Sequence, residues 1–235
     1  MLNLIHKELY SRHLLITDFT EEDQQKLMNA RILVIGVGGL GSPVLSYLAA
    51  AGIGNIGIVD YDKVSLSNLQ RQMIYNRSDI NKAKADIAAK RIRELNPDCF
   101  VEKYKREWNI DNATEILEKY EVLIDCSDNI TCRITSDIIS KSQGKPFVYG
   151  AVDGWEGQVS VFNYGNCGSY REAMNIQEKK PEKMNPVGVV GAVPGVAGSI
   201  MAAEVIKIIL SKGVVLAGQM LHFSLHVNSW QVLSL

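Results

Sequence analysis

The chain has 235 residues and a formal net charge of -1, and 46% of its residues are hydrophobic against 22% charged. This length suits one large domain, or one domain with an appendage, with enough apolar residues for a sizeable core. The balanced charge excludes the basic surface expected of a nucleic-acid-binding protein. The apolar runs are short or broken by glycine, and the N-terminus carries charges early. We therefore expect no membrane span, no secretory leader and a cytoplasmic location.

The first 29 residues are predicted to form an N-terminal helical arm. A helix is expected over 21–29, because Thr20 is a natural N-cap and acidic residues fill the first turn. Arg12 lies in this arm, ahead of the first predicted strand. The sequence pattern alone gives Arg12 the character of a surface residue.

A glycine-rich turn joins the first predicted strand, 32–35, to the next helix, which opens at Ser42-Pro43. The glycines of this turn are Gly36, Gly38, Gly39 and Gly41. Backbone N–H groups and the helix dipole make such a turn a binding site for phosphate. A tight turn without a ligand is the alternative, but the position between strand and helix favours phosphate binding.

Asp60 ends the second predicted strand, 54–60, and lies 19 residues after Gly41. This is the offset at which the acid of a Rossmann fold accepts hydrogen bonds from a ribose. A simple cap or turn former is the alternative interpretation of Asp60.

The polar stretch 60–72 departs from the pattern of a dehydrogenase, which would start a crossover helix there. It supplies Asn68 and Arg71, and Lys84 follows near the start of a helix predicted over 82–95. Cations beside a phosphate loop stabilise charge on a departing pyrophosphate, so the set favours a triphosphate over a dinucleotide. Exposed salt bridges are the alternative role for the two cations.

The next elements lead to a second polar strand end. A strand over 99–105, a helix over 112–120 and a buried strand over 122–126 precede Asp128, and Arg133 lies one turn into the following helix. Carboxyl ends of parallel strands meet in one crevice, so Asp128 should face Asp60. A carboxylate beside a bound triphosphate is the expected Mg²⁺ ligand. Alternatively, Asp128 only caps the helix that follows.

Strands are predicted at 147–150 and 158–162 around a turn, and two more near 221–225 and 230–235. Between these pairs, 165–186 is charged and lacks periodicity, and a small-residue helix then reaches Leu210. A long structureless segment in a compact domain is usually functional or disordered.

Five segments occur in one order, namely GVGGLG, DYDKVSLSNLQRQ, NKAKAD, DCSDN with Arg133, and GVVGAVPGVAGSIMAAEVIK. In this combination, over about residues 8–235, the chain resembles the ThiF/MoeB/HesA adenylyltransferases, the bacterial form of the ubiquitin-activating superfamily. The resemblance implies an α/β fold with a Rossmann-like, doubly wound, mainly parallel sheet and an antiparallel C-terminal extension. It also implies an ATP-binding half, 30–150, and a carrier-binding half, 151–235, with a mobile loop at 165–187.

The resemblance implies that Mg·ATP adenylylates the C-terminal glycine of a small β-grasp sulfur-carrier protein ending in Gly-Gly, with release of pyrophosphate. A separate sulfur donor would act later, and the thiamin pathway is favoured over the molybdopterin pathway. Arg12 would reach the ATP of the partner in a homodimer, Arg133 would hold the carrier tail and Asp128 would bind Mg²⁺. The implied nucleotide contacts are Gly36, Gly38, Gly39, Gly41, Asp60, Asp62, Asn68, Arg71, Gln72, Lys84, Asp128 and Asn129.

The chain departs from the family at its cysteines. Many relatives hold zinc with two C-x-x-C pairs, but here the first pair reduces to Cys167 and Tyr170 and the second is absent, so we expect no zinc site. Met184 stands where relatives often carry a cysteine. A thioether sulfur cannot act as a thiolate nucleophile, which argues against a covalent thioester or persulfide step at this position. Cys167 could substitute, although a bystander thiol is favoured.

Three other functions stay open at this point. The same fold could adenylylate a small-molecule or RNA-linked carboxylate. An NAD- or FAD-binding oxidoreductase would leave Arg71, Lys84 and Asp128 without a role. A non-catalytic docking module would not need the complete set of nucleotide residues.

Overall fold

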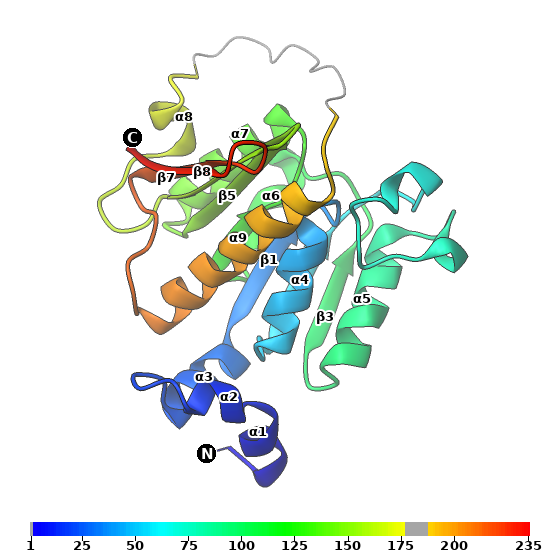
Figure 1. The fold of residues 1–235 in the computed structure, drawn as a ribbon, viewed down its shortest axis with the longest axis vertical. Helices are drawn as coiled ribbons and strands as arrows, with labels where there is room; N and C mark the ends of the chain where they lie inside the picture. The colour runs from blue at the N-terminus through cyan, green and yellow to red at the C-terminus, as the bar shows by residue number, and fades with distance from the viewer. Residues whose placement is uncertain (1, 177–187) are drawn as a thin grey trace.

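A computed structural model describes residues 2–176 and 188–235 (Figure 1). One sheet, ordered β3-β2-β1-β4-β5-β6-β7-β8, runs through the molecule. The first five strands in this order pair in parallel, and β5 to β8 pair antiparallel, so the predicted fold class is confirmed. The strands are Arg31–Ile35 (β1), Asn55–Val59 (β2), Phe100–Tyr104 (β3), Val122–Asp125 (β4), Phe147–Asp153 (β5), Glu156–Phe162 (β6), Gln219–Ser224 (β7) and Ser229–Ser234 (β8).

Helices cover both faces of the sheet (Figure 1). The α-helices are Leu4–Leu9 (α1), Ser11–Leu14 (α2), Glu21–Asn29 (α3), Gly41–Ala50 (α4), Lys84–Leu95 (α5), Ile110–Leu117 (α6), Ile130–Ser142 (α7), Tyr170–Ala173 (α8) and Ala192–Leu210 (α9). Short 3₁₀ turns lie at Leu66–Asn68 (η1) and Arg77–Asp79 (η2).

Alternate residues of the parallel strands enter two separate cores. On β1, Ile32 and Val34 pack with residues of α4, α5 and α9, whereas Leu33 and Ile35 pack with residues of α6 and α7. A strand covered on both faces needs apolar residues at successive positions, which explains the unbroken apolar runs of the sequence.

The predicted helix 82–95 begins two residues later than expected, at Lys84. Lys82 and Ala83 are occupied by pairing with the segment after β2: the N–H of Val64 donates to the Lys82 carbonyl, and Lys63 bridges Ala83. This pairing brings the start of α5 back to the carboxyl end of β2.

The segment predicted to lack structure contains a helix, α8, in its described part. Ser169 caps α8 and Tyr170 is buried, so residues 165–176 fold onto the body of the protein. The remainder of the predicted mobile loop, 177–187, lies outside the described residues, and its mobility stays a prediction.

Helix α9 is continuous although glycines interrupt its apolar run. Its length and apolar composition would allow it to cross a membrane, but more than half of it is buried inside the fold, where it contacts α4, β5 and β6. A Cβ atom at Gly198 would lie 2.4 Å from Pro43 Cγ, so glycine permits the close packing of α9 on α4. Burial in this core accounts for the apolar composition of α9.

Candidate nucleotide site

The glycine loop between β1 and α4 has a backbone that only glycine fits at two positions. Gly36 has φ +85°, and its N–H donates to the Val59 carbonyl at 2.8 Å, which ties the loop to the end of β2. A Cβ atom at Gly41 would lie 2.2 Å from the Gly36 carbonyl oxygen. The sharp turn directs the start of α4 toward the carboxyl edge of the sheet, as expected for a phosphate loop.

Asp60 fixes this loop from the neighbouring strand. Its buried carboxylate accepts the Val37 N–H at 2.7 Å and the Asp62 N–H at 2.8 Å. Burial raises the pKa of Asp60, against the opposing effects of these hydrogen bonds and of the Lys84 charge. Asp60 is therefore a structural part of the loop, with lone pairs left for a further donor.

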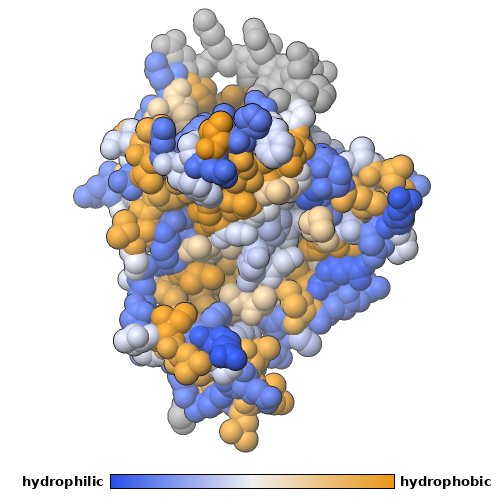
Figure 2. Space-filling view, in the orientation of Figure 1, coloured by the Kyte–Doolittle hydropathy of each residue, from blue (hydrophilic) through white to orange (hydrophobic). Residues whose placement is uncertain are grey.

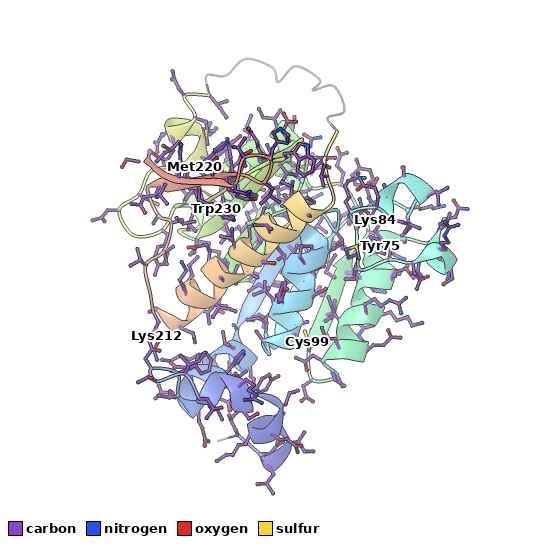
Figure 3. The ribbon with its side chains drawn as sticks, in the orientation of Figure 1. Tyr75, Lys84, Cys99, Lys212, Met220 and Trp230 are labelled. Carbon is purple, nitrogen blue, oxygen red and sulfur yellow. The ribbon has the colours of Figure 1, made fainter. Side chains whose placement is uncertain are left out.

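Lys84 is a nearly buried cation at the same edge. Its ammonium lies 2.9 Å from the Asp62 carboxylate, and its side chain is 8% exposed against 51% for Asp62. Close to it (Figure 3), the Tyr75 hydroxyl donates to the Val37 carbonyl in the glycine loop at 2.9 Å. The alternative of an exposed surface ion pair is wrong for Lys84, because only its partner is exposed.

Arg71 and Gln72 lie against the glycines themselves. A Cβ atom at Gly39 would be 3.6 Å from Arg71 Cδ, and one at Gly38 would be 3.6 Å from Gln72 Nε2. The Arg71 guanidinium donates to the Ser67 carbonyl at 3.0 Å. Gln72 is 3% exposed, and its Oε1 has no hydrogen-bond partner among the described residues. An acceptor buried in this way beside a phosphate loop suits a donor on a ligand.

The start of α9 closes this side of the loop. Pro194 lies 3.2 Å from a Cβ atom built on Gly39, and a Cβ atom on Gly191 would lie 2.2 Å from the Gln70 carbonyl oxygen. The Asn68 side chain accepts the Ser65 N–H at 3.2 Å, which shapes η1 beneath. The start of the GVVGAVPGVAGSIMAAEVIK segment therefore lies at the same end of the sheet as the glycine loop.

Asp128 follows β4 at this edge and is exposed. The alternative of a helix cap is wrong, because Asn129 caps α7 by accepting N–H groups from Thr131 at 2.8 Å and Cys132 at 3.3 Å. No hydrogen bond or ion pair to the Asp128 carboxylate is present within residues 2–176 and 188–235. The loop adjoins Gly36, since a Cβ atom there would lie 3.1 Å from the Cys126 carbonyl oxygen.

The Arg133 guanidinium packs against one aromatic ring. Its Cζ lies 5.2 Å from the centroid of Tyr149, and an Nη donates to the Ser127 carbonyl at 3.2 Å. Its Nε is buried and lacks an acceptor in the described part of the chain. Such a cation can bind a carbonyl or carboxylate brought to this edge.

Arg12 is the one predicted site residue that lies away from the others. It is exposed on α2, in the arm at the amino edge of the sheet, whereas the glycine loop and the start of α9 lie at the opposite edge (Figure 1). Arg12 cannot contact a phosphate at the glycine loop of its own chain.

The four cysteines are all free thiols in the structure. Cys167 Sγ accepts the Tyr164 N–H at 3.3 Å, and burial raises the pKa of Cys99 and of Cys132 to about 12. Groups of three or more potential metal ligands are absent from the described residues. Met184 lies outside them, and the expected lack of zinc stays a prediction.

Asp125 is the site residue that sequence reasoning missed. It is fully buried at the end of β4, and its carboxylate accepts hydrogen bonds from Ser127 and Ser136. The available signal was an aspartate closing an otherwise apolar strand, which must find donors because a buried charge is costly without them.

The observed edge fits Mg·ATP. A glycine loop with room over Gly38, two adjacent cations and a buried unpaired acceptor suit a nucleotide, and an exposed carboxylate suits a cation held partly by phosphate oxygens.

Comparison with known proteins identifies the family. The ThiF family model matches residues 10–235. The chain belongs to the ThiF family. The ThiF-family chain is 40% identical to the sulfur carrier protein adenylyltransferase of Thermus thermophilus, over 90% of this chain and 81% of that protein. It is 43% identical to a probable molybdopterin-synthase adenylyltransferase of Porphyra purpurea, over 94% of this chain.

This ThiF-family chain spans only part of several relatives. It covers 59% of the Porphyra protein and 48% of the adenylyltransferase and sulfurtransferase MOCS3 of Drosophila sechellia. Among solved structures, Escherichia coli MccB with MccA-N7isoASN matches with a TM-score of 0.85 at 20% identity, over 97% of this chain and 71% of that one. PaaA matches with a TM-score of 0.84 at 23% identity, over 99% and 74%. These structures share the fold.

Proposed function

We propose that this protein uses Mg·ATP to adenylylate the C-terminal glycine carboxylate of a ubiquitin-like sulfur-carrier protein, with release of pyrophosphate. The observation that carries the proposal is the gathering of Asp60, Arg71, Lys84 and Asp128 around one glycine loop. The adenylyltransferase names of relatives at 40% identity or more support it.

Each side chain has a role that follows from its chemistry. The N–H groups of the glycine loop and the start of α4 bind phosphate oxygens, and Asp60 accepts from the ribose. Arg71 and Lys84 stabilise the charge that develops on the leaving pyrophosphate. Asp128, with phosphate oxygens, would hold Mg²⁺, which supplies charge neutralisation and orientation when bound.

The reaction needs no general base. A carboxylate is already ionised at neutral pH and can attack the α-phosphorus directly, so the protein has to align the two reactants. Arg133 supports this alignment: its guanidinium lies beside the Asp128 loop, with Nε free of an acceptor in the described residues, and can bind the carrier tail. A Gly-Gly end suits such an approach because it has no side chains.

The homodimer is part of the proposal. A groove of about 510 Å³ runs between α4 and α9 and is lined partly by Tyr47, Ile200 and Trp230. Tyr47 and Trp230 are about half exposed, and Figure 2 shows hydrophobic residues interspersed with pale and hydrophilic ones over this face. Large exposed aromatic side chains along one groove suit a contact with a second protein chain.

Two-fold symmetry across this face explains Arg12. Consider a two-fold axis that lies in this face and runs perpendicular to the strands. It places the carboxyl ends of the strands of one copy beside the amino ends of the strands of the other copy. The arm of one copy then lies at the carboxyl edge of the other, so Arg12 reaches the nucleotide of its partner.

The pathway is proposed only as far as a sulfur carrier. The relatives are named for molybdopterin synthase and for a sulfur carrier protein in general, and nothing in the site favours thiamin synthesis over molybdopterin synthesis. The thiamin assignment stays a prediction.

The test is ATP–pyrophosphate exchange with purified protein, with and without a carrier ending in Gly-Gly. We expect exchange that requires both Mg²⁺ and the carrier, and that is lost when the terminal glycine is deleted. Strong exchange without any carrier would instead indicate a small-molecule carboxylate as the substrate.

A further inference from the structure

Asp125 is at the centre of a buried hydrogen-bond network behind the exposed Asp128. One carboxylate oxygen of Asp125 accepts the N–H of Ser127 at 2.8 Å and its hydroxyl at 2.6 Å. The other accepts the Ser136 hydroxyl at 2.8 Å, and the Trp108 indole N–H donates to that hydroxyl at 3.1 Å. The network links the end of β4 to α7 and to the segment before α6.

The loop that carries Asp128 is held on both sides of that residue. Ser127, immediately before it, donates its N–H and hydroxyl to Asp125, and its carbonyl accepts a hydrogen bond from the Arg133 guanidinium at 3.2 Å. Asn129, immediately after it, is fixed as the N-cap of α7. With both neighbours fixed, the Asp128 backbone has little freedom, while its carboxylate remains exposed.

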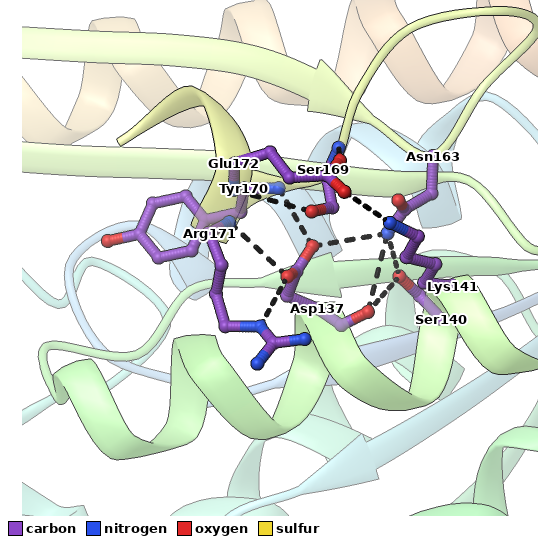
Figure 4. Close-up of polar contacts among 8 residues, drawn as sticks. All are labelled: Asp137, Ser140, Lys141, Asn163, Ser169, Tyr170, Arg171 and Glu172. Carbon is purple, nitrogen blue, oxygen red and sulfur yellow. Dashed lines mark hydrogen bonds and ion pairs between the residues drawn. The ribbon is translucent and has the colours of Figure 1, made fainter. Parts of the chain in front are cut away.

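A second buried aspartate, Asp137, makes hydrogen bonds that join two helices, and it serves as a comparison for Asp125. Asp137 on α7 is also fully buried, and it accepts the Tyr170 N–H at 2.8 Å and the Arg171 side chain at 3.2 Å (Figure 4). These bonds fix α8 on α7. Their donors are not in the loop that carries Asp128, whereas those of Asp125 include the residue next to it.

We propose that Asp125 is a positioning residue for the metal: by holding Ser127, it fixes the direction in which Asp128 presents its carboxylate to Mg²⁺. This inference rests on the proposed function, in which Asp128 is the metal ligand. Groups that orient a ligand from behind typically change metal affinity by roughly 10- to 100-fold when they are removed.

The direct test is a titration with Mn²⁺, followed by electron paramagnetic resonance, of protein saturated with a non-hydrolysable ATP analogue. Asp125→Asn keeps the side-chain volume but places an amide N–H₂ against a hydroxyl or N–H donor. We expect Mn²⁺ to bind at least about tenfold more weakly than to the wild type. The matched control, Asp137→Asn, should lower stability and leave Mn²⁺ affinity unchanged.

Equal Mn²⁺ affinity of Asp125→Asn and wild type would overturn the proposal, as would an equal loss in Asp137→Asn. If Asp125→Asn does not fold, Ser136→Ala removes only the second link of the network and should weaken Mn²⁺ binding several-fold. An unchanged Ser136→Ala protein would then contradict the proposal. The Trp108 indole N–H resonance reports whether the network has been broken in each variant.

Failure of this inference is distinguishable from failure of the proposed function. If the wild type binds Mn²⁺ with the analogue and exchanges pyrophosphate, the function stands whatever Asp125→Asn does. If the wild type does neither, the function itself is wrong.

Discussion

Lys84 is an ammonium withdrawn from water at the edge of a phosphate loop, with an exposed carboxylate as its partner. Burial of a cation is unfavourable unless an anion pairs with it. Asp62 is half exposed to solvent, so its pairing with Lys84 offsets only part of the cost of removing the ammonium from water. A second anion delivered by a ligand would complete the site. Under the proposed function, Lys84 would stabilise the negative charge that develops on the leaving pyrophosphate.

Lys84→Ala should lower carrier-dependent pyrophosphate exchange by roughly a hundredfold or more, because the substitution removes an ammonium positioned to stabilise negative charge on the leaving pyrophosphate. The matched control is Lys82→Ala, which removes an exposed ammonium two residues away that pairs loosely with Asp79 at 3.8 Å. Exchange in the control should stay near the wild-type rate. Equal effects of the two variants would contradict the role of Lys84.

Substitutions at two glycines should separate folding of the loop from nucleotide binding. Gly38→Ala has only the flexible Gln72 amide nearby, at 3.6 Å, so the protein should fold, but the added methyl group would stand over the loop and weaken ATP binding at least tenfold. Gly41→Ala would clash with the Gly36 carbonyl and should lower the melting temperature. Calorimetric titration and thermal unfolding measure the two effects, and tight ATP binding by Gly38→Ala would argue against a phosphate loop.

Among single residues, the sequence predicted those that stand at a characteristic distance along the chain from the glycine loop. Asp60 follows from its offset to Gly41, and Arg71 and Lys84 from their place after it. The sequence marks Asp125 only as an aspartate that closes an apolar strand. Its hydrogen-bond network could not be predicted, because the fold brings Ser136 and Trp108 to it from other elements.

Among the elements, α3 is linked to the segment that follows α9 through one buried carboxylate. Asp23 on α3 accepts from the Lys212 ammonium, 2.5 Å away, and from the Thr20 backbone N–H and hydroxyl at 2.8 Å each. Burial would raise the pKa of Asp23, but these hydrogen bonds outweigh it and lower the pKa to about 2.

This tie should make stability depend on pH in acid. A carboxyl group with a lowered folded-state pKa stabilises the fold above its unfolded pKa of about 4, and that contribution is lost as the pH falls toward 2. Asp23→Asn should therefore be less stable than wild type by about 1 to 2 kcal/mol at pH 6. Urea unfolding at pH 6 and pH 2.5 measures it, and a difference that does not shrink in acid would refute the tie.

The apolar runs of the sequence predicted the positions of most strands and helices, and the predicted ends differ from the observed ends by a few residues. The central strands β1, β2 and β4 were predictable because both of their faces are buried, so an unbroken apolar run marks each of them. Helix α8 was not, since a four-residue helix has little intrinsic stability and depends on Asp137 from α7. The later start of α5 likewise comes from pairing with residues 63–64, a contact that periodicity does not report.

For the whole molecule, the position of Arg12 makes a prediction about subunits. Arg12→Ala and Lys84→Ala should each be inactive alone, but a mixture that has exchanged subunits contains dimers with one complete site. An equal mixture should recover about a quarter of wild-type exchange, since half the dimers are mixed and each has one of two sites intact. No recovery, with mixed dimers demonstrated, would place Arg12 outside the partner's site.

The fold as a whole could be predicted from the order of motifs, and the structure and the family match bear it out. The position of the arm could not, because it depends on packing against the amino edge, where His6 pairs with Asp98 at 2.9 Å and Tyr10 is buried. That position is what turns Arg12 from a surface residue into a candidate for a shared site.

The central claim is that an acyl-adenylate forms on the carrier's C-terminus. Hydroxylamine traps such an intermediate as a hydroxamate, which the intact mass of the carrier reveals. With protein, Mg·ATP and a Gly-Gly carrier, we predict hydroxamate at the terminal glycine, lost with Asp128→Ala. Carrier that stays unmodified while wild-type protein consumes ATP to AMP would contradict the account.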